Sequence, residues 1–371
     1  MNDVKTTLSL LLAASAAAYG ADYLAFSGGY TAHAGKGIYS YRFDSANGSL
    51  KAMGVAIETD NPSFLAIDAK RHLLFAVHES NGPSAVSSFA IDAKSGKLAL
   101  INRVASGGSA ACHLALDRTG RWLAVANYGT GSVIVLPVAA DGRLDNAVAF
   151  DQHKGSGPNP MRQAGPHAHE VTFSPDNRFL LANDLGTDQI YVYRFDATRG
   201  TVTPNDPPSA KTAPGAGPRH LVFHPNGRIL YDVNEMAATV TAFRYDAAKG
   251  TLEEFQDIST LPEGFSERSG AEIAVSSAGT FLYASNRGQD TIALFAIDPL
   301  RFTLTAADRT PTLGSKPRHF ALDPTGAWLL VENQDSGNIA VFSVHPRTGQ
   351  LIPSAHAPVR VPDPVCLVFV P

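Results

Sequence analysis

The sequence predicts an all-β fold, a seven-bladed β-propeller with four antiparallel strands in each blade. One observation is a pattern of strand, turn and strand that recurs with spacings between 47 and 57 residues, a period typical of solenoids and propellers. The other is a divided unit: the last copy, VCLVFVP, stops after one strand, and its missing partners, DYLAFSGG and GIYSYRFDSANGSL, stand near the N-terminus. We expect the C-terminal strand to complete the first blade and close the ring, which a linear solenoid would not require.

Each unit begins with a short apolar strand, and the copies are SFLAID, CHLALD, HEVTFS, RHLVFH, AEIAVS, RHFALD and VCLVFV. A turn leads to a second strand such as ILYDVN or WLLVEN, and a third strand ends near Asp in YVYRFDATRG and TAFRYDAAKG. Gly typically stands four residues after that Asp or its equivalent, which suits a tight turn into an outer strand. These signals predict four strands in each unit.

The first strand of each unit alternates between two kinds of apolar residue. Large side chains recur on one side, at Leu65, Leu114, Val171, Leu221, Ile273, Phe320 and Leu367. Mostly small side chains recur on the other, at Ala66, Ala115, Thr172, Val222, Ala274, Ala321 and Val368. Such a strand suits a sheet packed between two neighbouring sheets, since a solvent-facing sheet would alternate apolar with charged residues.

The N-terminal segment differs from the repeats. Residues 1–21 contain Lys5, an apolar stretch over 8–18 and then small residues, an order typical of a secretory signal peptide. We expect either an exported protein, periplasmic or secreted, or an N-terminal extension of a cytoplasmic one. The remaining residues, 22–371, are predicted to form a single propeller domain.

The composition of the chain argues against some classes of binding partner. The net charge is −4, so no basic field favours nucleic acid or an anionic membrane, and no internal apolar run approaches the roughly 20 residues of a membrane span. The two cysteines, Cys112 and Cys366, fall in strands of non-adjacent units, and we expect both to be core residues without a disulfide. A closed ring leaves no obligatory interface, so we expect a monomer.

The strand directions bring polar residues together at one rim of the channel. The innermost strand starts there and the second strand ends there, so Arg219 and His220 are expected to meet Asn234 and Glu235. The same positions in other units hold different ionisable residues. Together they place His113, His169, His220, His319, Arg219, Arg287, Arg318, Glu170, Glu235 and Glu272 around one opening. Converging cations and bases in a cleft are typical of a functional site, whereas the recurrent Asn column suits strand-leaving turns.

Two connections reach the same rim. The segment 151–165 accounts for the longest spacing, and the segment 261–270 carries Arg268. Both are expected to wall or cover the site, or to be ordinary surface loops. His167 and His169 would face one side of a strand and could share a metal ion. Their spacing fixes no third ligand, such as Glu235 or His220, so we expect neither a metal nor another cofactor.

At these rim residues the sequence resembles the seven-bladed propeller lactonases. That family includes bacterial 6-phosphogluconolactonases and fungal carboxy-cis,cis-muconate cyclising enzymes. The similarity covers nearly all of residues 22–371, and its most specific stretches are GPHAHEVTFSPDNRFL, GAGPRHLVFHPNGRILYDVNE, LPEGFSERSGAEIAVSSAGTFLYASNR and KPRHFALDPTG. The resemblance implies catalytic roles for His169, Arg219, Glu235 and Arg287. The phosphogluconolactonases of this family are generally cytoplasmic, which an export signal would not match.

The leading hypothesis is a hydrolase of carbohydrate metabolism that opens a small anionic sugar-acid lactone, such as 6-phosphogluconolactone, at the channel mouth. His169 or Glu235 would take a proton from water, Arg219 would stabilise the oxyanion, and Arg287 with other arginines would hold a carboxylate or phosphate. The expected substrate-binding residues are His167, Glu170, His220, Arg268, Glu272, Arg318, His319 and Gln334.

Two alternatives remain open. A cycloisomerase of the muconate type would run the same groups in reverse and donate a proton to carbon. A binding propeller would have no turnover at all, because fold does not decide function. The catalytic hypotheses share one expectation, that Arg219→Ala lowers turnover severely while leaving thermal stability nearly unchanged.

Overall fold

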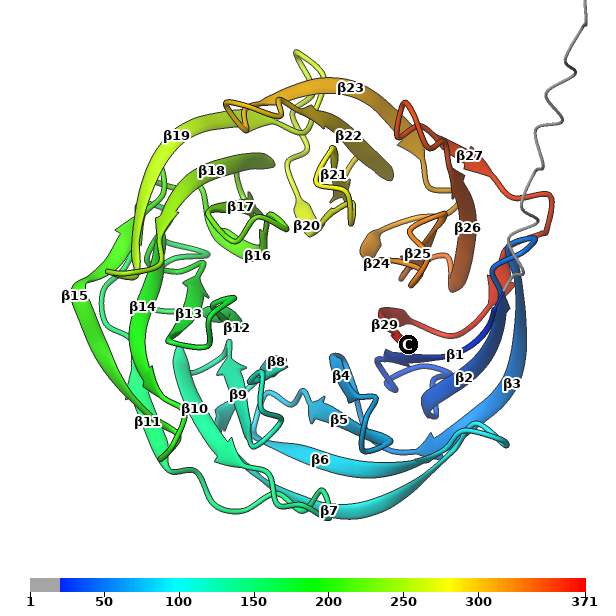
Figure 1. The fold of residues 1–371 in the computed structure, drawn as a ribbon, viewed down its shortest axis with the longest axis horizontal. Helices are drawn as coiled ribbons and strands as arrows, with labels where there is room; N and C mark the ends of the chain where they lie inside the picture. The colour runs from blue at the N-terminus through cyan, green and yellow to red at the C-terminus, as the bar shows by residue number, and fades with distance from the viewer. Residues whose placement is uncertain (1–20) are drawn as a thin grey trace, which may run out of the picture.

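Seven β-sheets surround a central channel in the computed structural model, which describes residues 21–371 (Figure 1). The predicted N-terminal leader lies, apart from Ala21, outside the described residues. Among the residues described, no helix has the length and apolar character needed to cross a membrane. The all-β, seven-bladed prediction is confirmed.

The strands of each blade run from the channel outward in chain order, except in blade 1. Blade 1 contains β29 (Pro364–Val370), β1 (Asp22–Gly29), β2 (Gly37–Asp44) and β3 (Ser49–Glu58). Blade 2 contains β4 (Leu65–Asp68), β5 (Leu73–His78), β6 (Pro83–Asp92) and β7 (Lys97–Ser109). Blade 3 contains β8 (Ala111–Leu116), β9 (Trp122–Asn127), β10 (Ser132–Pro137) and β11 (Ala149–Gln152). Blade 4 contains β12 (Ala168–Phe173), β13 (Phe179–Asp184), β14 (Gln189–Asp196) and β15 (Thr201–Lys211).

The last three blades continue the ring. Blade 5 contains β16 (Pro218–Phe223), β17 (Ile229–Asn234), β18 (Thr239–Asp246) and β19 (Thr251–Ser259). Blade 6 contains β20 (Gly270–Val275), β21 (Phe281–Asn286), β22 (Thr291–Ile297) and β23 (Leu304–Pro311). Blade 7 contains β24 (Pro317–Leu322), β25 (Trp328–Asn333) and β26 (Asn338–Val344), and its outer strand is divided into β27 (Leu351–Pro353) and β28 (Val359–Arg360).

The ring closes through the two ends of the chain, as the divided repeat predicted. Strand β29 pairs antiparallel with β1, with Leu24 opposite Val370 and Ser27 opposite Leu367. Figure 1 shows β29 as the innermost strand of blade 1, beside the first strand of the chain. Closure gives every inner strand a neighbour on both sides, so no blade face is left without a partner.

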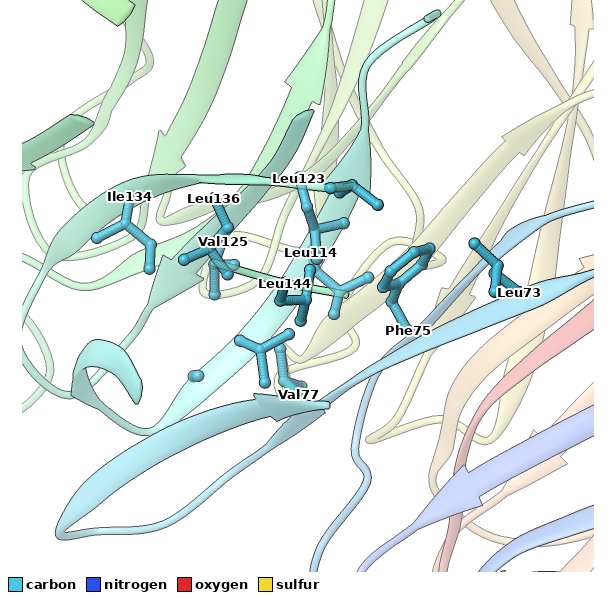
Figure 2. Close-up of a cluster of buried hydrophobic side chains, with 12 residues drawn as sticks. Leu73, Phe75, Val77, Leu114, Leu123, Val125, Ile134, Leu136 and Leu144 are labelled. Carbon is cyan, nitrogen blue, oxygen red and sulfur yellow. The ribbon is translucent and has the colours of Figure 1, made fainter. Parts of the chain in front are cut away.

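The core is divided into seven hydrophobic clusters, and each lies between two adjacent blades. Figure 2 shows the cluster between blades 2 and 3, where Phe75 and Val77 approach Leu114 and Leu123. The large residues predicted on the inner strands are all buried, with at most 7% of their surface exposed. Each such side chain contributes about 1.5–3 kcal/mol when it is fully buried.

Aromatic residues connect neighbouring blades by contacting the turn between the third and fourth strands of the next blade. The indole of Trp122 in blade 3 donates a hydrogen bond of 2.9 Å to the carbonyl of Ala197 in blade 4. Gly200 ends that turn with φ of 72°, and a Cβ there would lie 2.3 Å from the Trp122 ring. The Gly that follows the third strand is therefore required both by its backbone conformation and by the aromatic ring packed against it.

Candidate active site

A β-bulge near the start of several inner strands separates two levels of polar residues. The register shifts at Cys112 in β8, at His169 in β12, at Arg219 in β16 and at Arg318 in β24. A bulge places an extra residue opposite one residue of the partner strand and re-aims its side chain. Three of the bulged residues, Cys112, His169 and Arg318, line a cavity, whereas the residue after each bulge belongs to a buried layer described below.

The cavity has a volume of about 390 Å³ and lies where the inner strands begin and the second strands end. Its walls are formed by Tyr30, Glu79, Cys112, Tyr128, Arg162, His169, Glu235, Ser269, Arg287, Lys316 and Arg318. Four of these side chains are cationic and two are carboxylates, so the cavity favours an anionic group. We call it the cationic cavity.

Glu235 is the centre of the charge network in the cationic cavity. Its Oε2 lies 2.9 Å from Arg287 Nη2 and 3.2 Å from Arg219 Nε, and its Oε1 accepts a hydrogen bond of 2.6 Å from Arg162 Nη2. Burial raises the pKa of Glu235, but Arg287, Arg219 and Arg162 outweigh it and hold the pKa well below its usual range. Glu235 is therefore a carboxylate throughout the physiological pH range.

Arg219 is buried behind Glu235 and is only 2% exposed. Its Nη1 donates a hydrogen bond of 2.6 Å to the carbonyl of Ala271, while its Nε faces the carboxylate without hydrogen-bond alignment. Burial, together with Arg287 and Arg318, lowers the pKa of Arg219 to about 10, which still leaves it cationic at neutral pH. Arg287 is held in the same way, because its Nη2 donates to the Gly270 carbonyl at 2.8 Å.

His169 is buried, and one of its ring nitrogens has no hydrogen-bond partner in the described chain. Its Nε2 lies 4.0 Å from Glu235 Oε2, and its Nδ1 has no hydrogen-bond partner among residues 21–371. The ring meets Tyr128 edge-on, with centroids 5.5 Å apart. Burial, Arg219 and His220 lower the pKa of His169 well below its usual value. The imidazole is therefore neutral at neutral pH and able to accept a proton.

A chain of hydrogen bonds forms the wall between blades 7, 1 and 2. Arg318 Nη2 donates to the Tyr30 hydroxyl at 3.1 Å, and that hydroxyl donates to Glu79 Oε2 at 2.9 Å. The Arg318 guanidinium also lies 5.6 Å from the Tyr30 ring centroid, within the range of a cation–π contact. Burial raises the pKa of Tyr30, so the hydroxyl stays protonated and keeps both contacts.

Below the cationic cavity lies a second level that we call the histidine layer, formed by Phe64, His113, Glu170, His220, Glu272 and His319. His220 Nδ1 and His319 Nε2 lie 3.0 Å and 3.5 Å from Glu272 Oε2, and Phe64 packs 4.0 Å from the ring of His113. Burial lowers the pKa of these histidines and raises the pKa of both carboxyl groups. Burial therefore favours the uncharged forms of the five titratable groups in this layer.

The predicted site residues are thus distributed over different places. His169, Glu235, Arg287 and Arg318 line the cationic cavity with Arg219 behind them, whereas Glu170, His220, Glu272 and His319 belong to the histidine layer. His167 stacks on Tyr128 with centroids 4.4 Å apart. Arg268 is exposed and donates to the Ala237 carbonyl at 3.2 Å. Gln334 lines a neighbouring cavity instead.

Several lining residues were not among the predicted site residues. Arg162 lies on the 151–165 segment, whose extra length was the signal that could have identified it. Glu79 and Tyr128 follow the second strands of blades 2 and 3, at the position that Glu235 occupies in blade 5. Within 21–371, no three His, Cys, Asp or Glu side chains are arranged to hold a metal ion, and both cysteines are buried and free, as predicted.

The fold and the site together define the class of this protein, which is a seven-bladed propeller with a cationic cavity among its inner strands. The family model "Lactonase, 7-bladed beta-propeller" matches residues 25–369, and the chain belongs to this family. The resemblance predicted from the rim residues is confirmed.

Individual relatives cover almost the whole chain. It is 35% identical over 350 residues to 6-phosphogluconolactonase of Bacillus subtilis, covering 94% of this chain and 98% of the relative. It is 35% identical to 6-phosphogluconolactonase of Formosa agariphila, covering 85% and 91%. The solved structure of a periplasmic gluconolactonase of Pseudomonas aeruginosa superposes with a TM-score of 0.90 at 36% identity, covering 95% and 99%. These similarities support lactonase activity.

Proposed function

We propose that this protein hydrolyses a sugar-acid lactone of the gluconolactone type in the cationic cavity. The observation that carries the proposal is the pairing of a neutral histidine, His169, with a carboxylate, Glu235, that three guanidinium groups surround. Lactone opening needs a base for the attacking water and positive charge for the oxyanion. This cavity offers both.

His169 is the group best suited to activate water. Its neutral imidazole accepts the proton as the water oxygen bonds to the lactone carbonyl carbon, and Arg287 with Arg318 faces the oxyanion that forms. Collapse of the tetrahedral intermediate breaks the bond to the ring oxygen, and the imidazolium returns its proton to that oxygen. The product acid ionises, and the arginines hold its carboxylate.

Glu235 acts as a positioning residue in this mechanism. Both oxygens of this carboxylate are occupied by guanidinium groups, and at neutral pH it carries no proton to donate. Its two oxygens instead fix Arg162, Arg219 and Arg287 at distances of 2.6–3.2 Å. Guanidinium groups fixed before the reaction stabilise developing charge without reorganisation.

The same protonation states argue against the cycloisomerase alternative. Adding a proton to carbon requires a protonated donor, yet His169 is neutral and Glu235 is ionised at neutral pH. The periplasmic location of the Pseudomonas aeruginosa gluconolactonase supports our proposal that residues 1–21 export this protein. For an exported enzyme, an unphosphorylated lactone is the substrate we favour, and 6-phosphogluconolactone is the alternative.

The test is acid release in a pH-stat with glucono-1,5-lactone, 6-phosphoglucono-1,5-lactone and muconolactone. We expect turnover of the two sugar lactones, and a loss of about 10²-fold or more for His169→Gln. His356 is exposed, so His356→Gln is the matched control and should keep full activity. Wild-type rates no faster than buffer would favour a binding propeller, and lactone formation from carboxymuconate alone would favour the cycloisomerase.

A further inference from the structure

A second cavity adjoins the cationic one. It has a volume of about 520 Å³, and Tyr30 and Glu79 form part of the walls of both cavities. The hydrogen bond of 2.9 Å between the Tyr30 hydroxyl and Glu79 therefore lies in their shared wall. The second cavity therefore lies directly beside the first.

The chemistry of the second cavity differs from that of the first. Its side chains are mainly amides, hydroxyls and carboxylates, including Asn61, Ser80, Asn81 and Gln334. One imidazole, that of His33, joins them, and no Lys or Arg among residues 21–371 lines the cavity. Such groups accept and donate hydrogen bonds to hydroxyls, and the carboxylates repel phosphate. Apolar contacts come from Ala32 and from the ring of Tyr30.

One lining atom lacks a partner within the protein. Gln334 Oε1 is buried, yet it accepts no hydrogen bond from any residue of the described chain. A buried acceptor left unsatisfied costs about 1–3 kcal/mol. Gln334 lines the cavity, and a rotation of its amide would bring this oxygen to a ligand hydroxyl, which supplies the missing donor. In contrast, the Asn61 side chain is satisfied, since it accepts from the Thr31 backbone at 2.9 Å and donates to the Glu79 carbonyl at 3.1 Å.

We propose that the second cavity binds an additional, uncharged sugar ring of the substrate, so that the preferred substrate is a two-ring aldobionolactone. The inference rests on the proposed function, because it places the lactone ring in the cationic cavity. At about 390 Å³, that cavity alone is near the lower end of the roughly 300–1,000 Å³ of typical ligand sites. The adjoining space extends it toward groups that suit hydroxyls.

The first test compares kcat/KM for glucono-1,5-lactone with that for cellobiono- and lactobiono-1,5-lactone, which carry a second hexose. We expect at least one two-ring lactone to be preferred by about tenfold, and Gln334→Ala to lower that preference by about fivefold or more, since a lost hydrogen bond to an uncharged group costs about 1 kcal/mol. Gln289 stands after β21 in blade 6 and lines neither cavity. Gln289→Ala is the matched control and should keep the preference.

The second test separates this inference from the proposed function. Calorimetric titration with gluconate, cellobionate and lactobionate measures binding of the product acids without turnover. Hydrolysis of gluconolactone with no advantage for either two-ring lactone or acid would overturn the second-ring site alone. Tighter binding of a two-ring acid that Gln334→Ala abolishes, without hydrolysis of any lactone, would support the sugar site and overturn the proposed reaction.

Discussion

Glu235 and Glu272 are two buried glutamates in adjacent blades, and their chemistry is opposite. They are 7% and 8% exposed, so burial raises the pKa of both. Glu235 faces three guanidinium groups, and its pKa falls well below its usual range. Glu272 faces the imidazoles of His220 and His319, and its pKa is raised. The partners, more than burial itself, decide the direction in which the pKa of each glutamate moves.

The same contrast separates the cationic cavity from the histidine layer. His169 stands at the boundary, with its Nε2 4.0 Å from Glu235 and its ring centroid 5.1 Å from that of His220. The cationic cavity therefore holds fixed charges, whereas burial favours uncharged groups in the histidine layer below it. Each prediction that follows tests this difference between the two levels.

The largest effect is expected from removing the charge of Glu235. Glu235→Gln leaves Arg219 and Arg287 with one less anion in a buried setting, which costs about 3–5 kcal/mol for a broken buried pair. Turnover should fall by about 10²-fold or more, because the guanidinium groups lose their fixed positions. Urea unfolding and lactone hydrolysis measure the two effects.

Glu272→Gln is the matched control, because an amide replaces a carboxyl group whose uncharged form is favoured by burial. Its cost should stay below about 1.5 kcal/mol, the scale of one altered hydrogen bond. Equal destabilisation by the two substitutions would show that the histidine layer carries charge, and the contrast between the levels would be lost.

The next effect concerns Arg219. A rim residue on the surface could be replaced by Ala at little cost in stability, as the sequence suggested, but Arg219 is 2% exposed and contacts both Glu235 and Ala271. We therefore predict that Arg219→Ala also lowers stability. Arg219→Lys is the sharper variant, since lysine keeps the charge but cannot hold both partners with one planar group.

Arg219→Lys should lower kcat by about 10²-fold, because Glu235 and the guanidinium groups that it positions lose a fixed contact, with KM changed by less than about threefold. Arg228, at the other end of blade 5, is exposed, and Arg228→Lys serves as the control in steady-state kinetics. A rise in KM with unchanged kcat would instead assign Arg219 to ground-state binding.

The histidine layer predicts a pH dependence of stability. The pKa of His113 is lowered by burial, so below about pH 6.5 the unfolded chain binds a proton there that the folded chain does not. This group then lowers wild-type stability by up to about 1.4 kcal/mol per pH unit of acidification. The stability advantage of wild type over His113→Gln should therefore shrink between pH 6.5 and 5.5.

Urea unfolding of both proteins at pH 8, 6.5 and 5.5 measures this change. His356→Gln is the control, because this exposed residue meets water in both states and its substitution should show no such trend. An advantage of wild type that stays constant or grows on acidification would mean that His113 is protonated in the folded protein.

The sequence was sufficient for the fold because each blade repeats the same strand and turn pattern, and the divided unit shows directly how the ring closes. It placed the first two residues of each inner strand on one rim. The structure separates them into two levels, since the bulges at His169, Arg219 and Arg318 shift the register by one residue. A bulge leaves the hydrophobic alternation of the strand intact, so periodicity could not reveal it.

The repeat pattern could not predict the path of the longer loops either. Segment 151–165 carries Arg162 to Glu235, 73 residues further along the chain. By contrast, the segment 261–270 leaves Arg268 exposed. Both loops have the Gly and Pro content of turns, and nothing in their spacing distinguishes the one whose arginine reaches the cavity. Only the ion pair between Arg162 and Glu235 in the folded chain distinguishes the two loops.

The smallest effect is expected from Arg162, which belongs to the charged level but is half exposed. Its Nη2 reaches Glu235 at 2.6 Å and the Tyr128 hydroxyl at 3.3 Å, yet 44% of its side chain faces solvent. Arg162→Ala should raise KM by about fivefold while stability changes by less than about 0.5 kcal/mol, as for a surface substitution. Arg199→Ala, at an exposed pair 4.0 Å from Asp196, is the control in the same kinetics. A stability loss as large as that of Glu235→Gln would mean that this loop arginine holds the network together, and the charged level would then depend on the loop.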